Sequence, residues 1–130
     1  MIVLDASAAV DWLLQTAIGQ KIETRIYSRG ESLHTAHLLD VEVAQVLRRL
    51  VRDRTVTALR ADQALGDLLS IPMNRYPHFV FLTRIWQLRN NLTAYDASYI
   101  ALTETLGATL VTRDARLPSA PGHRAQIEVF

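Results

Sequence analysis

Two aspartates of the sequence each follow a short apolar segment of the kind that forms a buried strand. Asp5 comes directly after Ile2–Leu4, and Asp114 follows Ala108–Thr112 by two residues. Because ligands of open α/β sheets bind beyond the carboxyl ends of the strands, we expect both carboxylates at that edge of a sheet. The alternative role for each residue is structural: Asp5 caps the helix that follows it, and Asp114 occupies a turn.

Glu42 lies on the border of the apolar face of a helix predicted over 38–52. At 100° per residue, this face contains Leu39, Val43, Val46, Leu47 and Leu50. A carboxylate at the edge of a buried face is costly unless it is paired or binds a metal ion. An ion pair with Arg49 or with a neighbouring helix is the alternative. Asp40, by contrast, is interpreted as the N-cap of this helix and is given no chemical role.

A fourth acid, Asp96, stands in the first turn of another predicted helix. Thr93 is expected to cap the amide three residues on, and an acidic side chain there complements the positive end of the helix. Asp96 also lies one turn before Ile100, on the side of the helix that we expect to be buried. Ser7 and Thr112 add hydroxyl groups beside the two strand ends. The four acids could therefore converge on one rim.

A cluster of three or four carboxylates needs a cation, because like charges within a few ångströms repel strongly. The sequence has no cysteine, and nothing near His34 and His37 completes a zinc site. Oxygen ligands alone favour Mg²⁺ or Mn²⁺. Such a site suits phosphodiester hydrolysis, in which the metal activates water, orients the phosphate and stabilises the leaving oxygen. The glycine motifs of dinucleotide and P-loop sites are absent.

The charge balance excludes a polycation that coats nucleic acid by bulk charge. Fourteen Lys and Arg residues stand against thirteen Asp and Glu residues, which gives a net charge of +1. If four acids are withdrawn into one pocket, the rest of the chain is basic and could hold a polyanion. Arginine suits bidentate phosphate contact, and a solvated helix end is the alternative role. The candidates are Arg48, Arg49, Arg52, Arg54, Arg89, Arg113 and Arg116.

The apolar patterns predict one α/β domain over 1–130. Strands are expected at 2–4, 32–36, 71–76, 108–112 and 127–130, the last at a sheet edge, and helices at 6–15, 16–29 in part, 38–52, 57–70, 79–90 and 93–106. This alternation implies a mostly parallel sheet between helix layers. No segment has the pattern of a signal peptide or a membrane span, so we expect a cytoplasmic protein. Candidates for an apolar partner surface are Trp12, Phe79, Phe81 and Trp86.

Four segments, in order along the chain, resemble the PIN-domain family: 1–8 (MIVLDASA), 38–43 (LLDVEV), 92–102 (LTAYDASYIAL) and 110–117 (LVTRDARL). More narrowly, they are similar to the VapC toxins of bacterial toxin–antitoxin pairs. The resemblance implies a three-layer α/β/α sandwich and metal-dependent ribonuclease activity. It also implies that Mg²⁺ or Mn²⁺ is bound by an acidic quartet, with Thr112 as the hydroxyl residue of the last motif. The quartet consists of Asp5, Glu42, Asp96 and Asp114.

The same resemblance implies partners and a substrate: a homodimer, a VapB antitoxin that lies across the active-site groove, and structured RNA such as tRNA or ribosomal RNA. Two alternatives belong to other classes. A phosphate-accepting receiver domain needs a lysine on a late strand, whereas Lys21, the only lysine, lies in a helical stretch. A catalytically degenerate PIN domain that serves as a binding scaffold would lack one or more acids, and none is lost.

Overall fold

Five parallel strands form the centre of the computed structural model, which describes residues 1–130. Their order across the sheet is β3-β2-β1-β4-β5, with β1 at Ile2–Leu4, β2 at Leu33–Ala36, β3 at Met73–Tyr76, β4 at Thr109–Thr112 and β5 at Gln126–Val129. The three central strands are buried almost throughout, whereas β3 and β5 are partly exposed edges. The apolar runs of the sequence thus fill the middle of a sheet that is covered on both faces. The predicted parallel sheet is confirmed.

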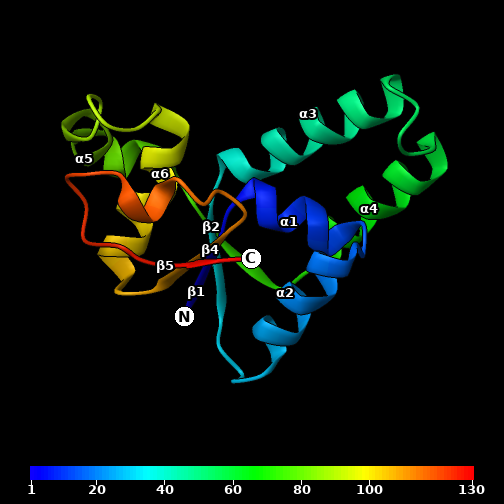
Figure 1. Cartoon of the computed structure of the whole chain (residues 1–130), viewed down its shortest axis with the longest axis horizontal. Coiled ribbons are helices and arrows are strands. Elements are labelled where there is room, and N and C mark those ends of the chain that lie inside the picture. Colours follow the sequence, from blue (N-terminus) through cyan, green and yellow to red (C-terminus); the bar gives the residue numbers. More distant parts are fainter.

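Helices cover both faces of this sheet and complete a three-layer α/β/α sandwich, as predicted (Figure 1). On one side lie α1 (Ala6–Leu13), α2 (Ala17–Tyr27), α3 (Leu38–Arg52) and α4 (Ala58–Ser70), and on the other side α5 (Leu82–Gln87) and α6 (Ala94–Leu106). The helices α3 and α4 extend away from the sheet as a pair. None of the helices has the length and apolar character needed to cross a membrane.

The strand order opens a crevice at the carboxyl ends of β1 and β4. From β1 the chain moves outward through β2 to β3, and it then returns to β4 on the other side of β1 before ending at β5. Neighbouring strands whose connections leave in opposite directions open such a crevice, and ligands of α/β proteins bind there. The pairing of Leu4 with Val111 brings the next residues, Asp5 and Thr112, to the same point of this edge.

The single helix predicted over 79–90 is wrong. The structure instead has a 3-10 turn at His78–Phe81, the short helix α5, and turns that continue to Leu92. Pro77 holds an extended backbone before the 3-10 turn, and Asn90 and Asn91, which are poor helix formers, follow the end of α5. Local sequence therefore breaks a stretch whose apolar spacing alone suggested one helix.

Gly19, in the first turn of α2, lets this helix pack directly on the backbone of α1. A Cβ atom at Gly19 would lie 1.9 Å from the carbonyl oxygen of Asp11, so the backbone would have to move. We expect Gly19→Ala to lower the free energy of unfolding by about 2 kcal/mol. Gly66 in α4 is the matched control, because a Cβ there meets nothing within 4 Å and alanine favours helix. Gly66→Ala should raise it by about 0.5–1 kcal/mol in urea unfolding, and equal midpoints would contradict the close packing at Gly19.

Candidate active site

The four predicted acids line one open cleft at the carboxyl edge of the sheet. The cleft has a volume of about 520 Å³. Asp5 follows β1, Glu42 lies on α3, Asp96 lies in the first turn of α6, and Asp114 lies in the loop after β4. The other lining residues are Ala6, Ser7, Val41, Gln45, Val46, Tyr95 and Tyr99. Four separate elements thus bring their carboxylates to one place.

Asp5 is almost fully buried, and three groups of the protein hold its carboxylate. Ser7 Oγ donates to Oδ1 at 2.6 Å, the Ala8 amide donates to the same oxygen at 2.9 Å, and Thr112 Oγ1 donates to Oδ2 at 2.5 Å. The bond from Ala8 makes Asp5 the N-cap of α1, as the structural alternative predicted. A carboxylate has about four acceptor sites, so about one site on Oδ2 remains for a ligand in the cleft. Asp5 therefore caps a helix and lines the site at the same time.

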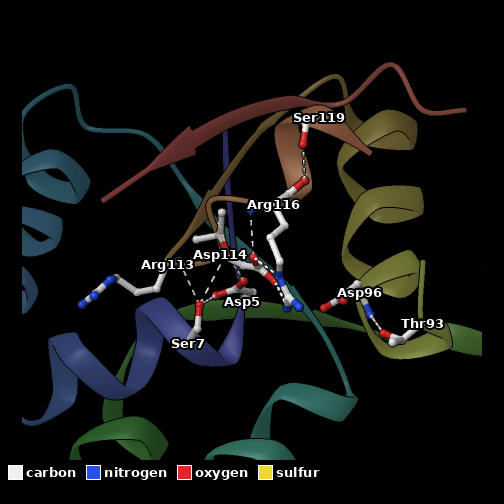
Figure 2. Close-up of polar contacts among 9 residues, drawn as sticks. Asp5, Ser7, Thr93, Asp96, Arg113, Asp114, Arg116 and Ser119 are labelled. Carbon is white, nitrogen blue, oxygen red and sulfur yellow. Dashed lines mark hydrogen bonds and ion pairs between the residues drawn. The ribbon is translucent and has the colours of Figure 1, made fainter. Parts of the chain in front are cut away.

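The hydroxyl groups that hold Asp5 also fix the loop that follows β4. Each hydroxyl proton is donated to Asp5, so each oxygen is free to accept a hydrogen bond. Ser7 Oγ accepts from the Arg113 amide at 2.9 Å, and Thr112 Oγ1 accepts from the Asp114 amide at 2.9 Å. Figure 2 shows the loop held against Asp5 in this way. The expected hydroxyl contributions are therefore present, and they set the position of Asp114.

Glu42 is bound by a residue that the sequence reasoning missed. Tyr99 Oη donates to Glu42 Oε2 at 2.5 Å, and the Tyr99 side chain is only 3% exposed. The alternative ion pair with Arg49 or a neighbouring helix is wrong: Arg49 is exposed, and the partner of Glu42 on the neighbouring helix α6 is a neutral hydroxyl group. Tyr99 lies three residues after Asp96, so helical spacing places the two on one face of α6. This spacing is the feature of the sequence that could have indicated Tyr99 as a residue of the site.

Asp40 is not the N-cap of α3, so this prediction is wrong. The N-cap is His37, which makes no capping bond with its side chain, and Asp40 lies in the first helical turn. The carboxylate of Asp40 accepts hydrogen bonds from Arg75 Nε on β3, at 3.0 and 2.9 Å. A charge-assisted bond to a neighbouring strand is stronger than a local cap, and no local sequence pattern predicts such a bond. Asp40 does not line the cleft.

Asp96 and Asp114 form the end of the cleft nearest α6, and only Asp114 has an arginine partner. Thr93 Oγ1 accepts from the Asp96 amide at 3.1 Å and caps α6, as predicted. Asp114 accepts from Arg116 three times: from Nε at 2.9 Å, from Nη2 at 2.6 Å and from the backbone amide at 2.9 Å. In Figure 2 the guanidinium of Arg116 lies between the two aspartates.

Burial and mutual repulsion disfavour the charged forms of three of these acids. Burial is the main cause that raises the pKa of Asp5, Glu42 and Asp96, and the charge of a neighbouring acid raises each pKa further. The Arg116 guanidinium instead lowers the pKa of Asp114. Carboxylates whose ionisation is disfavoured in a cleft are typical of functional sites, since a bound cation would favour their charged forms.

The donor atoms of the cleft fit a hard divalent cation. The candidate ligands are carboxylate oxygens, which Mg²⁺ and Mn²⁺ prefer, and no histidine lines the cleft. As the side chains stand, no three acidic or histidine residues are close enough together to hold one ion. Coordination by several of these acids therefore needs water ligands or small side-chain movements. Mg²⁺ normally keeps several water ligands in proteins.

The arginines considered as phosphate contacts lie in different environments. Four of them are exposed on and after α3: Arg48, Arg49, Arg52 and Arg54. Arg113 is paired with Asp11 at 2.6 Å, and the Arg89 guanidinium lies 4.8 Å from the ring centroid of Trp86. Of these arginines, Arg116 is the one that bonds one of the four acids, Asp114.

Two of the four aromatic residues expected at a partner surface are exposed. Phe79 is 70% exposed and Trp86 is 67% exposed, whereas Trp12 and Phe81 belong to the core. Val80 and Leu82 in the same segment are also exposed. The segment 79–86 thus presents large apolar side chains to solvent, which is unusual for a surface without a partner.

Tyr99→Phe tests the link between Tyr99 and Glu42. The change removes the hydrogen bond that favours the charged form of Glu42, so the pKa of Glu42 should rise further above its ordinary value. The free energy of unfolding should fall by about 1 kcal/mol. The carboxyl carbon resonance of Glu42, followed by NMR during a pH titration, reports the pKa. Tyr95→Phe is the control, because Tyr95 lines the same cleft but is 64% exposed, and an equal shift in that variant would contradict the assignment.

With this fold and cleft, the chain falls in the class of α/β proteins that carry an acidic site at the switch point of a parallel sheet. The chain belongs to the PIN domain family, whose model matches residues 2–122. It is 40% identical over 129 residues to Ribonuclease VapC12 of Mycobacterium tuberculosis, and the aligned residues cover 99% of this chain and 98% of that protein. Ribonuclease VapC9 of the same organism is 44% identical over 117 residues, covering 90% and 88%. The crystal structure of PAE2754 from Pyrobaculum aerophilum superposes with a TM-score of 0.70 at 27% identity, covering 98% and 83%.

Proposed function

We propose that the chain is a metal-dependent endoribonuclease that acts as the toxin of a toxin–antitoxin pair. The observation that carries this proposal is the convergence of Asp5, Glu42, Asp96 and Asp114, from four separate elements, on one open cleft. The near full-length identity of 40% with a ribonuclease supports RNA as the substrate. RNA cleavage would inhibit translation and growth.

In the proposed mechanism, Asp5, Asp96 and Asp114 hold Mg²⁺ or Mn²⁺ directly or through water. The bound cation supplies activation of water, orientation of the scissile phosphate and stabilisation of charge on the leaving 3′ oxygen. Glu42 completes the negative pocket. Its second carboxylate oxygen accepts no hydrogen bond from the protein and is therefore free to orient the attacking water.

Three neighbouring side chains keep these acids in place. Tyr99 fixes one oxygen of Glu42, and its own pKa is raised far above the usual range by burial and by that bond, so the phenol stays protonated as a donor. Ser7 and Thr112 direct Asp5 so that its remaining acceptor site serves the cleft. Positions fixed by such bonds before the substrate arrives lower the cost of reaching the reactive geometry.

The cleft also offers a way to hold RNA bases. Tyr95 is 64% exposed and Val41 is 73% exposed, and both line the cleft beside the acids. An exposed aromatic ring next to a phosphate site gives an unpaired base a surface on which to stack. Structured RNA with splayed bases, such as the loops of tRNA or ribosomal RNA, suits this arrangement.

Two protein partners belong to the same proposal. A VapB-type antitoxin would neutralise the enzyme by laying a segment across the cleft, whose exposed apolar wall offers that segment a surface. A second copy of the chain would form a homodimer, for which the apolar segment 79–86 is available. Cellular RNA as the target and a chain without cysteine both support a cytoplasmic site of action.

A catalytically degenerate scaffold is the alternative, and the integrity of the cleft argues against it. The charged forms of Asp5, Glu42 and Asp96 are disfavoured by burial and by repulsion, a cost that a scaffold without a cation would not need to bear. The experiment is to express the chain from an inducible promoter and to map new RNA ends. Discrete ends that are lost in Asp96→Ala are expected. If growth stops without such ends, or if Asp96→Ala produces the same ends, the ribonuclease assignment is wrong.

A further inference from the structure

Arg116 occupies Asp114 in a way that leaves little of that carboxylate free. Its Nε and Nη2 atoms contact one carboxylate oxygen each, at 2.9 and 2.6 Å, and its backbone amide adds a third bond at 2.9 Å. Of about four acceptor sites on Asp114, three are therefore used by one residue. A cation that takes Asp114 as a ligand has to compete with this guanidinium.

The contact is built so that it can be released. The side chain of Arg116 is 87% exposed, whereas the neighbouring Arg113, which pairs with Asp11, is only 32% exposed. An ion pair in water contributes little to stability, because solvent screens the charges and the long side chain loses freedom. The ion pair of Arg116 thus contributes little to the stability of the fold, and Arg116 is easily displaced from Asp114.

A second cleft of about 330 Å³ adjoins the first on the side of Arg116. The two clefts share only Asp96 and Asp114. The second cleft is further lined by Asn91, Leu92, Thr93, Arg116, Leu117 and Ala120. An RNA strand that runs through both clefts passes over the shared pair of acids, and its next phosphate then meets the polar side chains of the second cleft.

Given the proposed function, on which this inference rests, we propose that Arg116 is a displaceable counter-ion. It holds Asp114 while the site has no cation, and a divalent cation that binds Asp114 releases it into the second cleft, where it contacts an RNA phosphate. A free guanidinium offers a planar fork that matches two phosphate oxygens. Cation binding and RNA binding are therefore coupled through one side chain, and the coupling is reciprocal.

The displacement can be observed directly in a Mg²⁺ titration by NMR. The Nε–H resonance of Arg116, identified by its loss in Arg116→Gln, should shift or broaden as Mg²⁺ binds, while the Nε–H of Arg113 stays in place. Backbone amides of Ala8 and Ala97, next to Asp5 and Asp96, report occupancy of the site. If these amides move and Arg116 does not, the counter-ion role is overturned and the proposed function stands. If neither moves, cation binding itself fails, and both proposals fall.

Binding measurements test the coupling with a matched charge control. In calorimetry, Arg116→Gln should bind Mn²⁺ about two- to fivefold more tightly than the unchanged chain, because no guanidinium competes for Asp114. Arg113→Gln removes the same charge three residues earlier in the chain but leaves Asp114 paired with Arg116. The Mn²⁺ affinity of this variant should therefore change much less. Equal effects in the two variants would show that Arg116 acts only through its contribution to the net charge near the site, which would overturn the proposal.

The phosphate contact is tested with a 12-nucleotide 2′-O-methyl oligouridylate by fluorescence anisotropy. In Mg²⁺, Arg116→Gln should bind this probe about fivefold more weakly than the unchanged chain. In EDTA the two should bind alike, because Arg116 is then held by Asp114. A loss of equal size with and without Mg²⁺ would show that Arg116 contacts phosphate regardless of the cation, which contradicts its release.

Discussion

Asp5→Asn is expected to abolish RNA cleavage while the chain stays folded. Asparagine is as good an N-cap as aspartate, so the start of α1 keeps its bond to the Ala8 amide. The substitution removes the negative charge and places an NH₂ group beside Oγ1 of Thr112 or in the one acceptor position that serves the cleft. Loss of a charged ligand should reduce the cleavage rate by at least about a hundredfold. Single-turnover cleavage with purified protein in Mg²⁺ measures the effect.

The matched control for Asp5→Asn is Asp40→Asn. Asp40 is also an aspartate that is bound by the protein, but its partner is Arg75 and it lies outside the cleft. This variant should cleave at the unchanged rate and lose only the small stability of a half-exposed ion pair. Circular dichroism establishes that both variants are folded. Wild-type cleavage by Asp5→Asn would remove Asp5 from the site, whatever the behaviour of the control.

The main features of the fold and the acidic cleft can be predicted from local patterns in the sequence. Asp5 and Thr112 end two apolar strands, and parallel strands place their carboxyl ends at one edge, so their meeting was predictable. Thr93 and Asp96 form a cap that depends only on residues three apart. Such features are encoded by spacing, and no knowledge of the tertiary packing is needed to see them.

The features that were missed depend on which long side chain reaches across the structure. Tyr99 reaches Glu42 from a helix 57 positions further along the chain, and Arg75 takes Asp40 away from its expected capping role. Both contacts join residues from separate elements, and several other arginines were equally plausible partners by sequence alone. The sequence indicated Arg116 only as a candidate phosphate contact. Its hydrogen bonds to Asp114 depend on the loop conformation that Thr112 fixes.

Glu42→Gln should make the chain more stable in EDTA and less responsive to metal. Burial raises the pKa of Glu42, so at neutral pH the folded state carries a charge that its surroundings disfavour. The folded state binds a proton that the unfolded state has already lost, and the stability of the unchanged chain therefore falls as the pH rises from about 4.3 through the raised pKa. Glutamine keeps the bond from Tyr99 without this charge. The difference in unfolding free energy between the variant and the unchanged chain should open with rising pH and close in acid.

Divalent cation should reverse the order of these two proteins. At a Mn²⁺ concentration a hundredfold above the dissociation constant, the unchanged chain gains about 2.7 kcal/mol, which corresponds to roughly 10 °C in the melting temperature. Glu42→Gln should gain clearly less, because the carboxylate that disfavours the empty site is the one that favours the occupied site. If Mn²⁺ raises both melting temperatures equally, Glu42 is not part of the cation site.

Glu104→Gln separates this effect from the general behaviour of a partly buried glutamate. The Arg84 guanidinium lowers the pKa of Glu104, so its ionised form contributes stability that is present at neutral pH and lost as the pH falls. The substitution should therefore destabilise the chain at pH 7, with a difference that closes in acid, which is opposite in sign to Glu42→Gln. Mn²⁺ should stabilise Glu104→Gln as much as the unchanged chain, since Glu104 does not line the cleft. Opposite signs in EDTA and different responses to Mn²⁺ can both arise only if Glu42 belongs to a site built for a cation and Glu104 belongs to the fold.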